Sequence, residues 1–146
     1  MTLYTHLPPD QDQVRLIRLH AADSWDDELK ISLFPVSLSD PDRPEYQALS
    51  YVWGDPQQTI GIRVNNDHVL QITMNLADFL RQLRRNDCDR ILWADAICIN
   101  QKDNDEKSHQ VRRMGEIYRK ASFVVAWLGT DHILKMRSSE YNLFDT

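Results

Sequence analysis

Residues 91–99 read Ile-Leu-Trp-Ala-Asp-Ala-Ile-Cys-Ile, an apolar run that only Asp95 interrupts. A strand covered by helices on both faces has this composition, because neither of its faces meets water. We therefore expect residues 91–99 to form a strand near the centre of a sheet. Residues 123–128 are also continuously apolar and predict a second buried strand.

Three shorter strands are predicted on the N-terminal side of this run. Residues 14–19 and 29–36 carry the apolar and β-branched side chains of strands, and an acidic loop separates them. Residues 39–45 contain two prolines and have the composition of a turn, so any internal boundary is expected there. Residues 48–53 predict the third strand, which ends where Gly54 begins a turn.

A β-hairpin follows this strand, and the apolar pattern predicts its register. A three-residue loop at 65–67 places Ile62 opposite Leu70 and keeps the apolar side chains of both strands on one face. A two-residue loop would place Gln71 opposite Ile62 and would break that face. The sequence therefore favours the three-residue loop.

Two helices are predicted from apolar side chains that recur with helical spacing. The first follows Asn75, which is expected to act as its N-cap, and it ends near residues 85–86. Its buried stripe consists of Leu76, Phe79, Leu80 and Leu83. The second follows Asp103, and Glu106 stands three residues later, where a capping box would place it. Its buried stripe consists of Val111, Met114, Tyr118 and Ala121.

The order of these elements predicts the fold class. A succession of strand, helix, strand, helix and strand favours parallel strands joined by right-handed crossovers. We therefore expect an α/β protein with a mixed, mainly parallel sheet, flanking helices and an attached antiparallel hairpin, as in flavodoxin-like folds.

The composition is that of an ordinary folded domain. The chain has 146 residues, of which 42% are hydrophobic and 27% charged, which predicts one compact core. Its net charge of −5 disfavours nucleic acid as a partner, because binding to the phosphate backbone needs a basic surface. No apolar run approaches the roughly 18 residues of a membrane span, and the N-terminus lacks the pattern of a signal peptide. Two cysteines form neither a zinc motif nor a disulfide framework, which favours a cytoplasmic protein with reduced thiols.

Three blocks of sequence together resemble the fungal heterokaryon incompatibility (HET) domain. They are YQALSYVWGD at residues 46–55, LWADAICINQ at residues 92–101, and a block from Gln110-Val111 to Trp127-Leu128-Gly129. The resemblance implies three parts of the chain. They are a leader and strand arm at 1–45, a HET core at 46–129, and a C-terminal tail at 130–146.

The resemblance also implies a function. HET domains act in fungal non-self recognition, where they trigger cell death in fused cells of different genotype. The chain is therefore expected to be an effector or interaction domain that associates with itself or with other death-signalling proteins, without nucleic-acid or membrane partners. HET domains are thought to be remote relatives of the Toll/interleukin-1 receptor (TIR) domain, some members of which cleave NAD. The alternative hypothesis is thus a TIR-like NAD hydrolase, with NAD as its substrate.

A ligand site is expected beyond the carboxyl ends of the predicted strands, where open α/β sheets bind their ligands. The candidate ligand-binding residues are Ser50, Trp53, Gly54, Asp55, Trp93, Asp95, Asn100 and Gln101. Most of them have a structural explanation as well. A carboxylate such as Asp95 can tie a strand to a loop, amides can stabilise a turn, and tryptophans at strand ends often belong to the core.

Glu106 is the candidate catalytic residue. Cleavage of the bond between nicotinamide and ribose develops positive charge on the sugar, which a carboxylate can stabilise. The capping box explains a glutamate at this position with no chemistry and is the favoured interpretation, and the TIR resemblance points instead to Glu140 or to sequence that this chain lacks. No metal site is expected, because the Glu106 and His109 pair has no second copy. Cys98 with His109 resembles a thiol nucleophile and base, but a buried strand favours an inert thiol.

Overall fold

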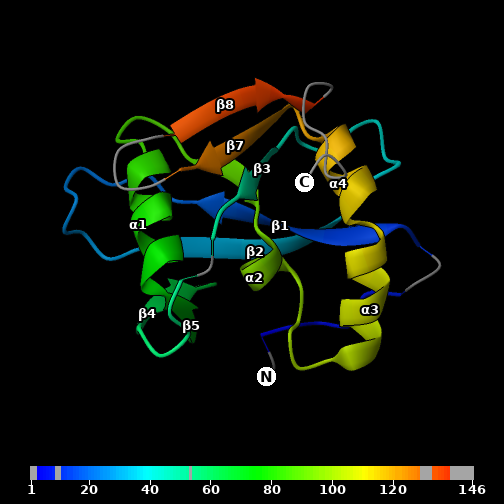
Figure 1. The fold of residues 1–146 in the computed structure, drawn as a ribbon, viewed down its shortest axis with the longest axis horizontal. Coiled ribbons are helices and arrows are strands. Elements are labelled where there is room, and N and C mark those ends of the chain that lie inside the picture. The colour runs from blue at the N-terminus through cyan, green and yellow to red at the C-terminus, as the bar shows by residue number, and fades with distance from the viewer. Residues whose placement is uncertain (1–2, 9–10, 53, 129–132, 139–146) are drawn as a thin grey trace.

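The computed structural model describes residues 3–8, 11–52, 54–128 and 133–138, which build one mixed sheet with helices packed against it. The strands of the described chain are β1 (Gln13–Leu19), β2 (Lys30–Ser37), β3 (Gln47–Ser50), β4 (Thr59–Val64), β5 (His68–Thr73), β6 (Arg90–Trp93), β7 (Phe123–Trp127) and β8 (Ile133–Arg137). Its helices are α1 (Met74–Leu83), α2 (Asp95–Cys98), α3 (Asn104–Arg112) and α4 (Met114–Lys120). Figure 1 shows α1 near one end of the central strands, α3 and α4 near the other, and α2 between them.

The sheet confirms the α/β class but not the expected parallel majority. Its strand order is β5-β4-β2-β1-β6-β3-β7-β8. Strand β3 pairs in parallel with β6 and β7, and β2 pairs in parallel with β4. The pairs β1–β2, β1–β6, β4–β5 and β7–β8 are antiparallel. Short connections explain β1–β2, β4–β5 and β7–β8, because a chain that returns at once to a neighbouring strand runs antiparallel to it.

Strands from both ends of the described chain belong to this one sheet. β1, from the segment expected to be an arm, lies between β2 and β6 and is buried along most of its length. β8, from the segment expected to be a tail, pairs along all five of its residues with β7. The segments before residue 46 and after residue 129 therefore complete the sheet that the intervening residues begin.

The hairpin of β4 and β5 has the predicted register. The paired residues are Ile60 and Ile72, Ile62 and Leu70, and Val64 and His68. In the loop, Asn65 and Asn66 adopt positive φ angles of 52° and 68°, a conformation that asparagine tolerates better than most residues. Ile62 and Ile72 are buried, as the apolar pattern predicts.

The prediction of one strand over residues 91–99 is wrong. β6 ends at Trp93, and the rest of the apolar run forms the helical turn α2. Asp95 begins this turn and accepts a hydrogen bond at Oδ1 from the backbone nitrogen of Ala96 at 2.9 Å. Ile97 and Cys98 are buried in the helix just as they would be in a strand. A short apolar run does not by itself distinguish these two alternatives.

The first helix begins earlier than predicted. Thr73, not Asn75, is its N-cap, and the Thr73 hydroxyl accepts a hydrogen bond from the backbone nitrogen of Leu76 at 3.4 Å. The side chain of Asn75 instead donates to the backbone oxygen of Val52 at 3.3 Å. The helix ends at Leu83 rather than near residues 85–86, and its predicted apolar stripe is buried.

The second predicted helix is divided into α3 and α4 at Arg113. Asp103 is its N-cap, as predicted, and Asp103 Oδ1 accepts hydrogen bonds from the backbone nitrogens of Asp105 and Glu106, each at 3.1 Å. The predicted stripe is partly wrong, because Val111 is 49% exposed and the neighbouring Gln110 is buried in its place. Gln110 Nε2 donates to the backbone oxygen of Gln13 at 3.1 Å, which compensates for the burial of this amide.

No helix in the described ranges has both the length and the apolar character needed to cross a membrane.

Candidate functional site

The carboxyl ends of β3 and β6 lie side by side, as the sequence predicts. These strands pair in parallel, with Ala48 opposite Trp93. The residues that follow them are therefore neighbours at one edge of the sheet. The Tyr51 hydroxyl donates to Asp95 Oδ1 at 3.3 Å, which directly links the ends of the two strands. Burial, followed by the nearby Asp95, raises the pKa of Tyr51, so this hydroxyl remains a donor.

Asp95 also anchors the loop that follows α2. Gln101 Nε2 donates to the backbone oxygen of Asp95 at 2.9 Å and to that of Ile99 at 3.2 Å. Asn100 Oδ1 accepts from the backbone nitrogen of Lys102 at 3.2 Å. Asp95, Asn100 and Gln101 thus share one half-buried region, where their side chains hydrogen-bond to nearby backbone and Asp95 also accepts from Tyr51. A ligand-binding role for these three residues stays a prediction.

Gly54 and Asp55 form an exposed turn beyond β3. Gly54 has a φ of 80°, and a Cβ atom built on it would lie 2.5 Å from Asn75 Nδ2, so both conformation and space favour glycine. Asp55 Oδ1 accepts from the backbone nitrogen of Gln57 at 2.9 Å. Ser50, the last residue of β3, is half-buried at the same edge. Trp53 lies outside the described residues.

Trp93 belongs to the hydrophobic core. Its relative exposure is 0%, so a ligand has no access to the ring in this structure. The ring meets Tyr118 edge-on, with the ring centres 5.6 Å apart. The Tyr118 hydroxyl donates to the backbone oxygen of Leu49 at 2.7 Å, which secures this contact to β3.

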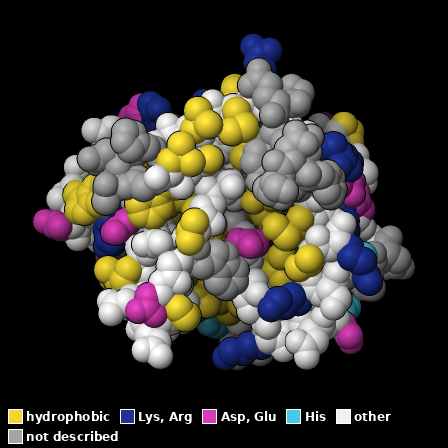
Figure 2. Space-filling view, viewed as in Figure 1, with side chains coloured by type: hydrophobic (Ala, Val, Ile, Leu, Met, Phe, Trp, Pro, Cys, Tyr) yellow, Lys and Arg dark blue, Asp and Glu magenta, His cyan; other side chains and the backbone are white. Residues whose placement is uncertain are grey.

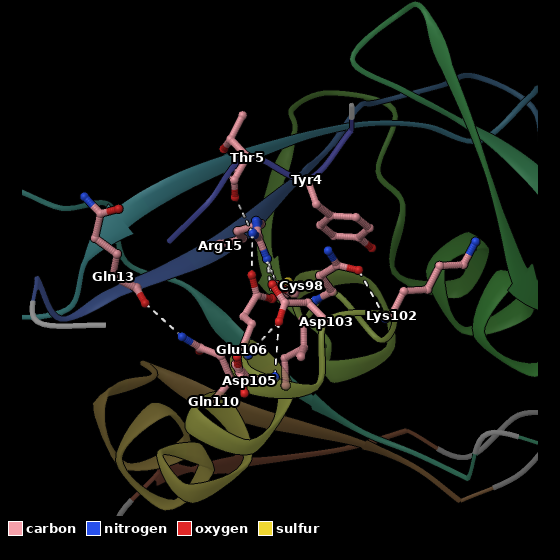
Figure 3. A network of polar contacts seen from close by, with 12 residues as sticks. Tyr4, Thr5, Gln13, Arg15, Cys98, Lys102, Asp103, Asp105, Glu106 and Gln110 are labelled. Atoms are coloured by element: carbon pink, nitrogen blue, oxygen red, sulfur yellow. Dashed lines mark hydrogen bonds and ion pairs between the residues drawn. The ribbon is translucent and has the colours of Figure 1, made fainter. Parts of the chain in front are cut away.

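Glu106 is held by Arg15 in a buried ion pair. Arg15 Nη1 donates to Glu106 Oε2, and Arg15 Nη2 donates to Glu106 Oε1, both at 2.7 Å. The two side chains are 3% and 8% exposed. The backbone nitrogen of Asn100 gives a third hydrogen bond, to Glu106 Oε2 at 2.6 Å. The predicted capping box is therefore replaced by this ion pair, because the carboxylate points from α3 toward β1 (Figure 3).

Arg15 is the centre of this network, and the sequence reasoning missed it. Its guanidinium also donates to the backbone oxygens of Cys98 at 3.1 Å and Thr5 at 2.5 Å. It lies 4.9 Å from the centre of the Tyr4 ring. The Tyr4 hydroxyl donates to the backbone oxygen of Ile97 at 2.7 Å, and burial raises its pKa to about 12. The available signal was an arginine between the apolar residues Val14 and Leu16 of a predicted strand, since a buried charge needs a partner.

A small cavity of about 140 Å³ adjoins Glu106. Its lining residues are His6, Leu7, Asp103, Asp105, Glu106, His109 and Gln110. Asp55 and Asp95 do not line it, so this cavity does not unite the three predicted carboxylates. In the described part of the chain, no group of three or more His, Cys, Asp or Glu side chains is arranged to hold a metal ion. Cys98 is buried, and burial raises its pKa to about 12, which opposes a nucleophilic role.

Comparisons with known proteins identify the family. Residues 46–143 match the family described as Heterokaryon incompatibility protein (HET). The chain is 44% identical over 128 residues to Heterokaryon incompatibility protein 6, OR allele, of Neurospora crassa. The aligned region covers 80% of this chain and 18% of that protein, so the chain spans less than a fifth of this relative. No solved structure matches. The chain belongs to the HET family.

Proposed function

We propose that this chain acts in heterokaryon incompatibility as an effector domain that associates with further copies of itself. The observation that carries the proposal is the open edge of the sheet at β8. In the described part of the chain β8 pairs with β7 alone, and it is the last strand in the order. An edge strand presents backbone donors and acceptors that can pair with a strand of another molecule.

Exposed apolar side chains surround this edge. On β8, Ile133 and Leu134 are 39% and 46% exposed. Val52 and Leu128 follow the ends of β3 and β7, where those strands pair in parallel, and are 75% and 67% exposed. We call these four residues the apolar rim. Figure 2 shows apolar side chains gathered on the upper part of the molecule, over the positions of β7 and β8 in Figure 1.

A second copy of the chain is the partner that this edge fits. Edge strands are commonly protected from pairing by lysine side chains. On β8, however, the Lys135 ammonium lies 4.1 Å from the centre of the Phe123 ring, which directs it back over β7. The net charge of −5 opposes contact between two copies, so association is expected to strengthen as salt screens that repulsion.

The proposal extends to cell death as the outcome and the cytoplasm as the location. Cys88 and Cys98 are both free thiols, which suits a reducing compartment. We also propose a remote relationship to TIR domains, and the parallel pairing of β3 with β6 and β7 is the feature that supports it. We do not extend the proposal to NAD hydrolysis by Glu106, because its carboxylate is occupied by Arg15 and the backbone of Asn100. The other candidate glutamate, Glu140, lies outside the described residues.

Expression of the chain in a filamentous fungus tests this function. The wild-type chain is expected to arrest growth, and Leu134→Lys, which places a charge on the exposed edge, is expected to abolish the arrest. Val111→Lys is the matched control, because Val111 is 49% exposed on α3, away from this edge. Equal toxicity of the Leu134 variant at equal protein level, or no toxicity of the wild-type chain, would contradict the proposal.

A further inference from the structure

A cavity of about 360 Å³ lies at the amino-terminal ends of the three parallel strands, whereas Tyr51 and Asp95 meet beyond their carboxyl ends. Gln47 begins β3, Arg90 begins β6 and Phe123 begins β7, and all three line the cavity. Lys135 of the neighbouring strand β8 lines it as well. The volume is at the lower end of the range typical of small-molecule sites, about 300–1,000 Å³.

The charge of this cavity is opposite to that of the whole chain. Three cations line it, Arg85, Arg90 and Lys135, against one acidic residue, Glu45. Among the described residues, Arg85 pairs with Asp87 at 2.8 Å, whereas neither Arg90 nor Lys135 has a carboxylate within 4.0 Å. Within the described ranges, an acidic protein thus carries a pocket with two cations that have no acidic partner, and an anion would balance their charge.

Arg90 is held in position by neutral groups. Its guanidinium donates to the backbone oxygen of Leu83 at 3.0 Å and to Gln47 Oε1. These contacts use some of its five N–H donors, so others remain for a ligand. Burial, followed by the nearby Arg85, lowers the pKa of Arg90.

Lys135 and Phe123 also line the cavity, from strands β8 and β7. The Lys135 ammonium lies 4.1 Å from the centre of the Phe123 ring, and Ile91 adds an apolar side chain. Small-molecule sites typically combine an apolar surface with a small number of polar groups that converge on the ligand. We propose that this cavity binds a small organic anion, in which a phosphate or carboxylate group lies between Arg90 and Lys135 and an apolar body contacts Phe123.

Calorimetric titration with phenyl phosphate tests the proposal directly. This probe has an aromatic ring and close to two negative charges at neutral pH. We expect saturable binding with a dissociation constant of about 1 mM or lower, weakened by added salt. Benzoate distinguishes a carboxylate site from one that requires phosphate, and uncharged phenol measures the contribution of the ring alone.

Charge-removing variants locate the site. Arg90→Gln and Lys135→Gln should each weaken phenyl phosphate binding about tenfold or more, the loss expected for one hydrogen bond to a charged group. Lys135→Gln changes an exposed side chain on an edge strand, so it remains informative if Arg90→Gln unfolds. Arg119→Gln, on the exposed face of α4, removes the same charge elsewhere and should leave affinity unchanged.

Cys88 provides a second readout, because it is exposed and lines this cavity, whereas Cys98 is buried. Phenyl phosphate should slow the alkylation of Cys88 by iodoacetamide in the wild-type chain and should protect it less in Lys135→Gln. Equal affinity for phenol and phenyl phosphate, unchanged affinity in both charge variants, or no protection of Cys88 at millimolar ligand would overturn the proposal.

Discussion

Arg15 and Glu106 form a buried ion pair with two hydrogen bonds of 2.7 Å, which joins the inner strand β1 to helix α3. The residues are separated by 91 positions in the chain, so the pair ties the segment before the HET match to the middle of the domain. Both carboxylate oxygens of Glu106 are used. The geometry therefore gives this glutamate a structural task, which the capping pattern of the sequence did not reveal.

Removing one partner of this pair should destabilise the domain strongly. Glu106→Gln leaves the Arg15 charge buried without a counter-ion, which is expected to lower the free energy of unfolding by about 3–5 kcal/mol. Urea denaturation followed by circular dichroism measures this change. Lys107→Gln, an exposed neighbour on the same helix, should change it by less than about 0.5 kcal/mol.

Replacing both partners with apolar residues should recover much of that loss, because burial of two charges is itself costly. Arg15→Met combined with Glu106→Leu is therefore expected to be more stable than Glu106→Gln alone. If Glu106→Gln unfolds at the same urea concentration as the wild-type chain, the ion pair does not hold β1 and α3 together.

The N-cap of α3 should make a smaller contribution. Asp103 Oδ1 accepts from two backbone nitrogens at the start of the helix, so Asp103→Ala should cost about 1 kcal/mol of unfolding free energy. Ser108→Ala, an exposed change within the same helix, serves as the control and should be nearly neutral. A cost equal to that of the control would show that the cap is not formed in solution.

Stability should fall at high pH because tyrosine hydroxyls are buried. The pKa of Tyr4 is raised to about 12 from an ordinary value of 10.0. The unfolded chain therefore ionises first, and the stability contributed by neutral Tyr4 is fully present below pH 10 and is lost toward pH 12. Tyr46 and Tyr51 also have pKa values raised mainly by burial, so they add to the loss.

Denaturation at pH values from 9 to 12 measures this effect through Tyr4→Phe. The variant lacks one ionisable hydroxyl and should lose less unfolding free energy across this interval than the wild-type chain. Identical pH dependence of the two proteins would mean that Tyr4 is not buried as the structure places it.

The turn at Gly54 should not tolerate a side chain. Gly54→Ala requires a positive φ at an alanine, which costs about 1–2 kcal/mol, and its Cβ would also clash with Asn75. Asn75→Ala removes the two closest atoms, Nδ2 and Cγ, but not the cost of the backbone conformation. The thermal stability of the double variant is therefore expected to lie between those of Gly54→Ala and the wild-type chain. The effect of Asn75→Ala alone is measured separately and subtracted. Full recovery would contradict the strained conformation.

Local patterns predicted much of this fold, because they depend on neighbouring residues only. The register of the β4–β5 hairpin follows from the spacing of its apolar side chains, and the cap at Asp103 follows from one residue type at a helix start. The parallel pairing of β3 with β6 was instead expected from the order of strands and helices, which favours parallel strands joined by crossovers. It is this pairing that brings Tyr51 to Asp95.

Features that depend on distant contacts could not be predicted in the same way. The end of β6 at Trp93 and the helical turn of α2 satisfy the same apolar pattern as a longer strand. The partner of Glu106 lies on β1, so local sequence around α3 indicates only a capping box. The number of antiparallel pairs depends on where each short connection returns the chain, which hydrophobic periodicity does not specify.

Sedimentation velocity over a range of protein concentrations is the most direct test of self-association at the β8 edge. The wild-type chain and Val111→Lys should both shift to larger sedimentation coefficients as concentration or salt increases, whereas Leu134→Lys should remain monomeric. A wild-type chain that stays monomeric at every concentration, or a Leu134→Lys variant that assembles as the wild type does, would contradict the account.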